Sequence, residues 1–432
     1  MKFLSTRGDA PPVSADAALQ AGAAPDGGLY LPDLLPGFTP ADFDADTGLA
    51  DVARRLLAPF FAGTPLAAAL AEICRDAFDF PCPEVRPFGP DTGPAILELF
   101  HGPTGAFKDF GARFLFRAFA ALGQSEDAPF TVLVATSGDT GGAVGCAAEG
   151  LAGVRAFILF PKGRISAFQE RQLCCWKPPV SALRIDGDFD DCQRLVKAAF
   201  ADTALTGRHH LTSANSISVG RLLPQMSYWA HASLRHFRAR GEKPGLVIPT
   251  GNLGNAFAAI LARACGLPIG PVVLATNANA TLADWRETGE YRARPSLATL
   301  ANAMDVGAPS NFERLAAFSE DGGQSTIEAA IRVDDDAIRE TIRSTFETTG
   351  YIACPHTATA LAAWKRLSRK AREDRGWIIG ATAHPAKFAD IVEPLIGQTI
   401  PLPSSLGAVL ERPVLVADIP ADLNALAAAL EP

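Results

Sequence analysis

A single lysine between two phenylalanines stands at the start of a predicted helix. The stretch "HGPTGAFKDFGARF" (101–114) places Lys108 between Phe107 and Phe110, directly after a Gly-Pro-Thr-Gly turn. Apolar neighbours disfavour the charged form of an amine, and a neutral amine attacks carbonyl carbon near neutral pH. The pattern therefore predicts a reactive lysine. Taken alone, the same residues are also typical of a helix-start lysine whose stem runs past aromatic rings.

Two glycine-rich turns predict anion sites. "ATSGDTGGAV" (135–144) and "PTGNLGNAFAAI" (249–260) each follow an apolar run and open a helical pattern. The first amides of a helix lack intrahelical acceptors, and Gly251 and Gly254 let a bound group approach the backbone closely. Such turns also occur as plain tight connections, so each is weak evidence alone. A third turn, "GATAHPAKF" (380–388), places Thr382 after an apolar run, with His384 and Lys387 shortly behind it.

The reactive lysine and the anion sites complement one another. A nucleophilic amine of this kind requires an aldehyde partner, and a phosphate on that partner would be held by one of the glycine turns. Pyridoxal phosphate carries both groups. The combination therefore predicts an enzyme that uses this cofactor.

The elements around these residues alternate between strands and helices, as in α/β proteins. Short apolar runs alternate with Ala-rich helical segments, which is typical of parallel strands covered by helices on both faces. Ligands of such sheets bind at the carboxyl ends of the strands, where the three turns lie. The strands are predicted at 130–136, 154–160, 182–187, 245–251, 271–277 and 376–382.

At 432 residues the chain is longer than one hydrophobic core usually organises. Turn signals and two helical patterns, around 42–60 and 64–78, predict a separate N-terminal unit over residues 1–90. Residues 91–395 are expected to form the main domain, with a smaller subdomain at roughly 125–225 inside it. Residues 396–432 are expected to be a C-terminal extension that ends in a helix on the surface.

Composition bounds the class of protein. The net charge is −8 and no run of Lys or Arg forms a basic stripe, so nucleic acid is not expected as a partner. The N-terminus has no signal-peptide pattern and no stretch has the roughly 20 apolar residues of a membrane span, so a cytoplasmic protein is expected. Eight scattered cysteines without a CxxC pair predict free, mostly buried thiols and no metal site.

Five ordered segments together resemble one family. "HGPTGAFKDFG", "ATSGDTG", "SANSISVGR", "PTGNLGN" and "TAHPAKF" are similar to the threonine synthases among the fold-type-II pyridoxal-phosphate enzymes. The resemblance extends to "STRG" and "APDGGLYLP" near the N-terminus. It implies a tryptophan synthase β-like α/β fold, with two open α/β subdomains, mainly parallel sheets and a small N-terminal unit.

The resemblance also implies roles for individual residues in cofactor binding. Lys108 matches the lysine that forms a Schiff base with the cofactor, and Thr382 matches the hydroxyl that faces the pyridine nitrogen. Phe107 and Asp139 border the cofactor. The loop that binds the cofactor phosphate in this family is matched here by Gly251, Asn252, Leu253, Gly254 and Asn255.

Two further segments match substrate-binding positions. Thr136, Ser137, Gly138 and Thr140 resemble the loop that binds the substrate carboxylate, and an ordinary helix cap by Asp139 or Thr140 is the alternative. The residues that hold the substrate phosphate in this family are matched here by Asn215, Ser216 and Arg221. A guanidinium suits this task, because it bonds two phosphate oxygens at once. A surface arginine is the alternative for that last residue.

Several positions carry no assigned role. Gly105 departs from the family, because many relatives have a large apolar residue there. His101, His356 and His384 lie within or near the matched segments, and for each of them a structural contact is as good an explanation as proton transfer.

The implied reaction converts O-phospho-L-homoserine and water into L-threonine and phosphate. The substrate amine displaces Lys108, which then becomes the general base for the Cα proton. Two alternatives remain at this stage: a phospho-lyase that stops at elimination and releases ammonia and a keto acid, and a catalytically silent ligand-binding homologue. A monomer and a homodimer are both compatible with the sequence.

Overall fold

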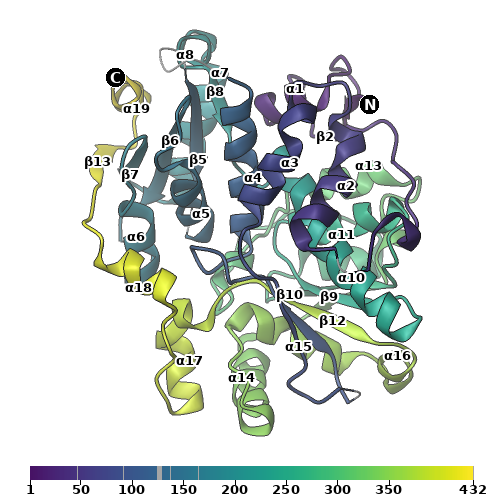
Figure 1. Cartoon of the computed structure of the whole chain (residues 1–432). Coiled ribbons are helices and arrows are strands. Elements are labelled where there is room, and N and C mark those ends of the chain that lie inside the picture. Colours follow the sequence, from purple (N-terminus) through teal and green to yellow (C-terminus); the bar gives the residue numbers. More distant parts are fainter. Residues whose placement is uncertain (46, 91, 124–128, 137, 164, 432) are drawn as a thin grey trace.

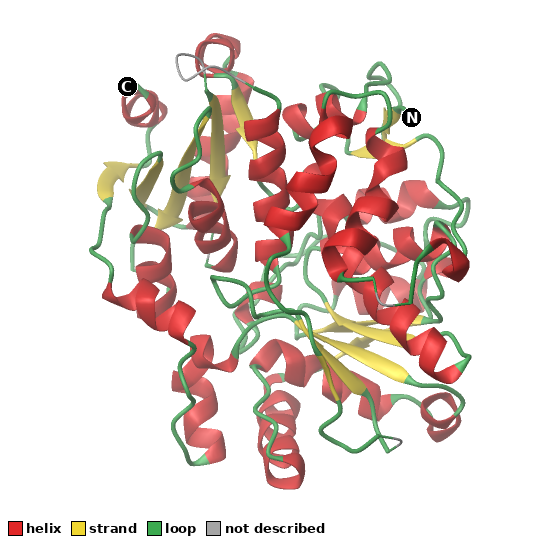
Figure 2. Ribbon diagram, viewed as in Figure 1, coloured by secondary structure: helices red, strands yellow, loops and turns green. Residues whose placement is uncertain are grey.

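The chain forms two separate sheets and an N-terminal unit (Figures 1 and 2). The structure is a computed structural model, and it describes all residues except 46, 91, 124–128, 137, 164 and 432. Each sheet is covered by helices, as the alternating sequence pattern predicted. The reactive lysine lies on the helix that runs between the smaller sheet and the N-terminal helices.

The larger sheet has six strands in the order β11-β10-β9-β12-β4-β3. Its neighbouring strands are parallel except for β3, which runs antiparallel to β4. The predicted strands at 245–251, 271–277 and 376–382 are confirmed as β9, β10 and β12. The bounds are β3 (Glu84–Val85), β4 (Ala95–Glu98), β9 (Gly245–Pro249), β10 (Val272–Thr276), β11 (Ala329–Arg332) and β12 (Trp377–Ala381).

The smaller sheet has five strands in the order β13-β7-β6-β5-β8, and all neighbours are parallel. The predicted strands at 130–136, 154–160 and 182–187 are confirmed as β5, β6 and β7. Strands β5 and β6 are almost entirely buried, which explains their continuous apolar sequences. The bounds are β5 (Phe130–Ala135), β6 (Val154–Pro161), β7 (Val180–Asp186), β8 (Leu211–Ser213) and β13 (Ala417–Pro420).

The helices connect these strands and cover their faces (Figure 2). Their bounds are α4 (Lys108–Ala121), α5 (Asp139–Ala148), α6 (Ala167–Cys174), α7 (Phe189–Ala201), α8 (Thr203–His209), α9 (Val219–Leu222), α10 (Met226–Arg240), α11 (Gly254–Ala264), α12 (Thr281–Thr288), α13 (Phe312–Phe318), α14 (Asp335–Thr349), α15 (Pro355–Arg366), α16 (Arg369–Glu373), α17 (Ala389–Ile396), α18 (Ser404–Glu411) and α19 (Leu423–Leu430). Short 3-10 helices lie at η1 (Pro40–Asp42), η2 (Leu223–Gln225), η3 (Asn302–Met304), η4 (Gln324–Thr326) and η5 (Pro385–Phe388).

The N-terminal unit packs against the helix that begins with the lysine. It contains the antiparallel pair β1 (Phe3–Ser5) and β2 (Tyr30–Pro32) and the helices α1 (Ala15–Ala21), α2 (Leu49–Phe61) and α3 (Leu66–Ala77). The two helices predicted around 42–60 and 64–78 are confirmed as α2 and α3. Phe114 of α4 lies 5.9 Å, between ring centroids, from Phe61 of α2. Since α4 also contacts α5, the N-terminal unit supports one side of α4 and the smaller sheet the other.

The C-terminal segment completes the smaller sheet. It runs along the outer edge of that sheet in Figure 1, where β13 pairs with β7. Arg184 of β7 donates to both carboxylate oxygens of Asp418 on β13. The predicted terminal helix is present as α19, and it buries Leu426 and Leu430 against the core of the smaller sheet. A strand in this segment was not predicted.

Two further observations concern the chain as a whole. All eight cysteines are free and seven are buried, which confirms the predicted free, mostly buried thiols. No helix among the described residues is both long and apolar enough to cross a membrane.

We expect Leu426→Ala to destabilise the smaller sheet. Leu426 is fully buried, and removal of a buried leucine side chain typically costs about 2–5 kcal/mol. Urea unfolding should show a lower transition midpoint for this variant. Leu402→Ala is the control, because Leu402 is 44% exposed. Equal midpoints for both variants would contradict a structural role for α19.

Candidate active site

The lysine turn is fixed between two neighbouring strands of the larger sheet. Lys108 is the first residue of α4, which follows β4 after nine residues, 99–107. The amide of Phe107 donates to the carbonyl of Thr382, and the amide of His384 donates to the carbonyl of Gly105, both at 2.9 Å. Because β4 and β12 are parallel neighbours, their carboxyl ends bring Lys108 and Thr382 to one edge of the sheet.

The Gly-Pro-Thr-Gly turn before the lysine encloses a buried carboxylate. Asp109 accepts hydrogen bonds from the amide of Thr104 at 2.9 Å and from its hydroxyl at 2.7 Å. Burial raises the pKa of Asp109 to about 6, although the bonds from Thr104 oppose the rise. A Cβ at position 102 would lie 2.4 Å from the carboxylate, and Gly105 has φ +66, so the turn requires glycine at both positions. The departure from the family at Gly105 therefore belongs to a well-defined turn.

Of the two phenylalanines predicted to shield the lysine amine, Phe107 lies near it. Lys108 is half-buried, and its Nζ lies 5.9 Å from the ring centroid of Phe107. Burial lowers the pKa of Lys108 to about 8, while the negative charge of Asp139 opposes this shift and the positive charges of Arg221 and Lys387 add to it. The second phenylalanine, Phe110, packs into the aromatic core against Phe80 and Tyr228.

A buried ion pair bridges the two subdomains beside the lysine. Asp139, the first residue of α5, lies 2.7 Å from the Nζ of Lys387 on η5, and both side chains are almost completely buried. The same Nζ donates to the carbonyl of Thr104 at 2.9 Å. Burial alone raises the pKa of Asp139, but Lys387 and Lys108 outweigh it and hold that pKa well below its usual range. Lys387 belongs to the third turn, but its role was not predicted.

The three histidines whose roles were open make structural contacts. His356 is buried, which lowers its pKa to about 4, and its Nε2 accepts a bond of 3.2 Å from the amide of Ala303. Burial also lowers the pKa of His384 to about 4, and its Nδ1 accepts from the amide of Ala386 at 3.2 Å. The Nε2 of His101 lies 2.7 Å from a carboxylate oxygen of Glu98.

The first glycine turn is capped by a threonine. The hydroxyl of Thr136 accepts from the amides of Gly138 at 3.0 Å and of Gly141 at 3.1 Å. The alternative of a cap by Asp139 or Thr140 is wrong, because both residues lie inside α5, whose N-cap is Gly138, and the oxygen that accepts from Gly141 belongs to Thr136, directly after β5. Gly138 has φ +154, and a Cβ there would lie 2.5 Å from Gln169. Ser137, which was predicted to bind the substrate carboxylate, lies outside the described residues.

The second glycine turn has room for a ligand at its helix end. A Cβ on Gly254 would have no neighbour closer than 3.7 Å, whereas one on Gly251 would lie 2.8 Å from the Cα of Met304. Leu253 takes the left-handed conformation, with φ +64. Asn255 is buried, and its Oδ1 accepts from Tyr228 at 2.7 Å and Trp229 at 2.8 Å. Its Nδ2 has no partner within the described chain.

The predicted substrate-phosphate site contains a buried arginine that has no ion-pair partner among the described residues. Arg221, on α9, is buried and donates through Nη1 to the carbonyl of Ala214 at 2.7 Å. Its Nε has no partner and no carboxylate forms an ion pair with it in the described part of the chain. Burial lowers the pKa of Arg221 to about 10. Asn215 and Ser216 are half-buried nearby in sequence, and the hydroxyl of Ser216 accepts from the Nδ2 of Asn252 at 2.5 Å, which joins this site to the second glycine turn.

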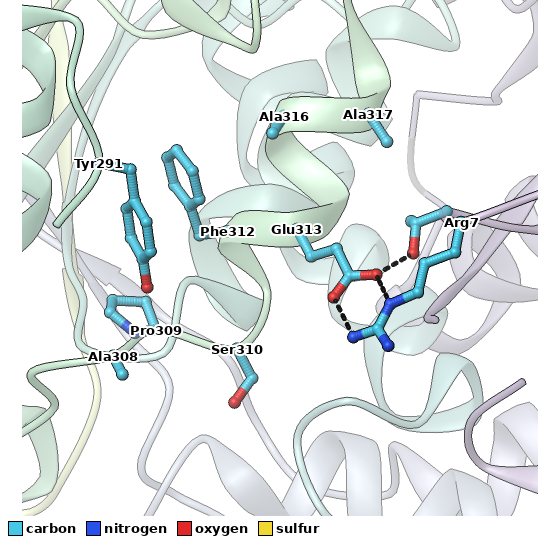
Figure 3. Close-up of a pocket in the computed structure, with 10 residues that line it drawn as sticks. Arg7, Tyr291, Ala308, Pro309, Ser310, Phe312, Glu313, Ala316 and Ala317 are labelled. Atoms are coloured by element: carbon cyan, nitrogen blue, oxygen red, sulfur yellow. Dashed lines mark hydrogen bonds and ion pairs between the residues drawn. The ribbon is translucent and has the colours of Figure 1, made fainter. Parts of the chain in front are cut away.

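A pocket lies on the far side of the second glycine turn, where the amide of its Ser310 donates to the Oδ1 of Asn252 (Figure 3). It has a volume of about 630 Å³ and is lined by Thr6, Arg7, Tyr291, Ala308, Pro309, Ser310, Phe312, Glu313, Ala316 and Ala317. None of these residues belongs to the predicted site. We expect the reaction at Lys108 and not in this pocket, because the reaction needs an amine of lowered pKa and the volume of a pocket alone supplies no chemistry.

The described residues fit pyridoxal phosphate. The amine of Lys108 has a lowered pKa, the N-terminus of α11 presents free amides and open space at Gly254, and the buried Nδ2 of Asn255 is an unused donor. Thr382 lies beside the lysine turn. The unpaired Arg221 provides for a second anion.

Comparisons with known proteins agree with this site. Residues 94–381 match the family model described as pyridoxal-phosphate dependent enzyme, which together with two open α/β subdomains defines a fold-type-II pyridoxal-phosphate enzyme. Residues 2–78 match the threonine synthase N terminus and residues 357–430 the threonine synthase C-terminal model. The chain belongs to the threonine synthase family.

Individual relatives support the same conclusion. Threonine synthases of Serratia marcescens and of Escherichia coli (strain K12) are each 38% identical over 429 residues, covering 99% of this chain and 98% of the relative. The crystal structure of threonine synthase with bound pyridoxal phosphate from Brucella melitensis is 36% identical, with a TM-score of 0.91 over 100% of this chain and 98% of that chain. Maize serine racemase, 18% identical with a TM-score of 0.54, shares the fold. The predicted fold, family, activity and cofactor are confirmed.

We expect Gly254→Ala to weaken cofactor binding without destabilising the apoprotein. The added methyl group has no neighbour closer than 3.7 Å in the protein, but it enters the space at the end of α11 that we expect the cofactor phosphate to occupy. Titration of apoprotein with pyridoxal phosphate should show a Kd raised about tenfold or more, the effect of one lost charge-assisted hydrogen bond.

Gly207→Ala is the matched control for this experiment, because a Cβ at this helical position meets nothing within 4 Å and lies on an exposed part of α8. Thermal unfolding of both apoproteins should resemble wild type. An unchanged Kd for Gly254→Ala would show that the cofactor phosphate lies elsewhere.

We expect Lys387→Met to raise the pKa of Lys108. The substitution removes a positive charge that lowers this pKa and leaves the attraction of Asp139 without its buried partner. Reaction of the apoprotein with pyridoxal phosphate needs the neutral amine, so the pH dependence of imine absorbance should move about one unit or more to the alkaline side. Lys365→Met is the control, because Lys365 is an exposed lysine that contacts Ser344 instead. A profile unchanged or moved to the acid side would contradict the assignment.

Proposed function

We propose that the site at Lys108 converts O-phospho-L-homoserine and water into L-threonine and phosphate, with the residues named below in these roles. The observation that supports this proposal is that open space at the start of α11 and a buried arginine with a free Nε accompany a lysine of lowered pKa. The end of α11 suits one phosphate, and the unpaired Arg221 suits another. A cofactor with a single phosphate fills only one of them, so the second site supports a substrate that is itself phosphorylated.

Lys108 acts twice in this proposal. Bound pyridoxal phosphate supplies an aldehyde that takes up amines and a conjugated ring that accepts electrons from Cα. The amine of Lys108 is released when the substrate amine takes its place, and it then removes the proton from Cα. A pKa of about 8 suits this base, because an appreciable fraction of the amine is neutral near pH 7 to 8.

The charged neighbours of Lys108 hold the substrate and stabilise the leaving group. Arg221, together with Asn215 and Ser216, binds the substrate phosphate and stabilises the negative charge that grows on it as the bond to Cγ breaks. Because Arg221 has no carboxylate partner in the described chain, its charge is available to the ligand. Burial strengthens this interaction, since water screens it less.

The start of α5 is assigned to the substrate carboxylate. Gly138 and Thr140 flank its first amides, and the Thr136 hydroxyl fixes the turn in which these amides lie. Ser137 keeps this role only as an expectation. Asp139 borders the cofactor and remains an anion through its pair with Lys387. Phe107, Thr382, Gly251, Asn252, Leu253, Gly254 and Asn255 complete the proposed cofactor site.

The proposal also covers the cellular location, the domain boundaries and the partners of the enzyme. Eight free thiols are typical of a reducing compartment, which supports the cytoplasm. The expected domains, 1–90, 91–395 and 396–432, are supported by the family models over 2–78, 94–381 and 357–430. The boundary of the smaller subdomain near residue 125 lies outside the described residues. A small molecule is the expected partner, nucleic acid is not, and monomer or homodimer remain the two expected states.

Product analysis tests the proposed function. We expect the wild-type enzyme with O-phospho-L-homoserine to release threonine and phosphate in equal amounts. Release of 2-oxobutanoate and ammonia would support the phospho-lyase instead, and absence of any product would support a silent homologue. Lys108→Ala should lower threonine formation at least about 10³-fold, because it removes both the covalent anchor and the general base. Lys365→Ala should retain activity, since Lys365 lies on the C-terminal turn of α15 and contacts Ser344.

A further inference from the structure

A second buried arginine lies behind the proposed phosphate site. Arg314, on α13, is completely buried, and burial lowers its pKa to about 9. It donates to the carbonyl oxygens of Tyr30 and Ile217 and to the Oδ1 of Asn311. A buried guanidinium is costly unless such acceptors surround it, and these three acceptors are all neutral. The arrangement holds three chain segments together around one planar group.

Asn311 transmits this arrangement to the two loops of the proposed site. Its Oδ1 is held by Arg314, so its amide nitrogen points the other way. That nitrogen donates to the carbonyl of Asn252 at 2.9 Å and to the carbonyl of Ser216 at 3.2 Å. Asn311 is itself completely buried. One side chain therefore fixes the distance between the second glycine turn and the segment that contains Ser216.

The contacts of Arg314 also reach the N-terminal unit. Tyr30 belongs to β2, and Ile217 follows Ser216 in the segment after β8. On the surface of the same helix, Glu313 forms an ion pair with Arg7 (Figure 3). It also accepts a hydrogen bond from the Thr6 hydroxyl. That exposed pair contributes little by itself. The buried contact of Arg314 is the one that connects β2 to the loop carbonyls.

We propose that Arg314 is a positioning residue for the substrate phosphate, and that it acts through Asn311 on Ser216 and Asn252. This inference rests on the proposed function, which assigns the substrate phosphate to Asn215, Ser216 and Arg221. Arg314 itself does not touch the phosphate. It holds the loop carbonyls in one position, so that the hydroxyl of Ser216 and the guanidinium of Arg221 converge on the same anion without reorganisation on binding.

The geometry of the guanidinium explains why position 314 needs an arginine. The nitrogens of this group donate in one plane, and each of Nε, Nη1 and Nη2 bonds a different acceptor here. A lysine would place one ammonium group among the same oxygens and could not keep all three directions. Arg314→Lys keeps the charge and loses the fork, so it tests positioning separately from charge.

Asn311→Asp is the more selective test. A carboxylate at this position keeps the acceptor for Arg314 but has no donor for the carbonyls of Asn252 and Ser216. Under saturating pyridoxal phosphate, we expect the KM for O-phospho-L-homoserine and the Ki of inorganic phosphate to rise about tenfold or more, with kcat changed much less. Imine exchange with L-2-aminobutyrate, which has no phosphate, should keep the wild-type affinity within about twofold.

Arg263→Lys is the matched control. Arg263 is a half-buried arginine that donates to the carbonyls of Gly270 and Thr326, away from the proposed site. It should leave the KM, the Ki and the amino acid affinity unchanged. If Arg314→Lys does not fold, Asn311→Asp alone decides the question, because it preserves the contacts of the arginine.

Two results would overturn the inference. One is a wild-type KM and phosphate Ki in a folded Asn311→Asp variant. The other is an equal loss of affinity for phosphate and for L-2-aminobutyrate, which would indicate general loosening of the site. Failure of the proposed function would look different from both results. The wild-type enzyme would then form no threonine, and the variants would be compared by how much inorganic phosphate stabilises each of them against unfolding.

Discussion

The whole arrangement depends on burying one lysine amine where positive charge exceeds negative charge. Lys108, Lys387 and Arg221 supply three cations, and Asp139 and Asp109 supply two carboxylates, of which Asp109 has its pKa raised to about 6. Such an excess is costly in a protein interior unless anions bind there. Two bound phosphates, as proposed, would provide those anions. The proposed affinity for phosphates follows from this charge distribution, whereas the lowered pKa of Lys108 follows mainly from burial.

The two subdomains share the task of maintaining this distribution. Asp139 begins a helix of the smaller sheet, and Lys387 follows the last strand of the larger sheet. Their ion pair, together with the bond from Lys387 to Thr104, closes the lysine turn from both sides. Fold-type-II architecture makes this possible, because the carboxyl ends of parallel strands present their turns at a common edge. On the other side, the aromatic packing of α4 against α2 fixes the helix itself.

Local patterns in the sequence predicted the parts of the site but not their partners. The strands, the lysine and the glycine turns follow from apolar runs, residue types and spacing. The contact of Lys387 with Thr104 joins residues 283 positions apart, and no periodicity reports such a distance. Likewise, the left-handed residue in the second turn is Leu253, not a glycine, because its loop is held by tertiary contacts. Strand β13 was missed, since a short, mostly exposed edge strand lacks the continuous apolar run that identified the buried strands.

The same charge distribution decides which groups can transfer protons near neutral pH. Burial and the neighbouring cations Lys108 and Lys387 lower the pKa of His356 to about 4, although Asp139 opposes the shift, so this histidine is neutral and its Nε2 is used by a backbone amide. His384 is neutral for a similar reason. A general base is most effective when its pKa lies near the working pH. Lys108, with a pKa of about 8, meets that condition better than either histidine, which supports the proposal that one amine serves both as covalent anchor and as base.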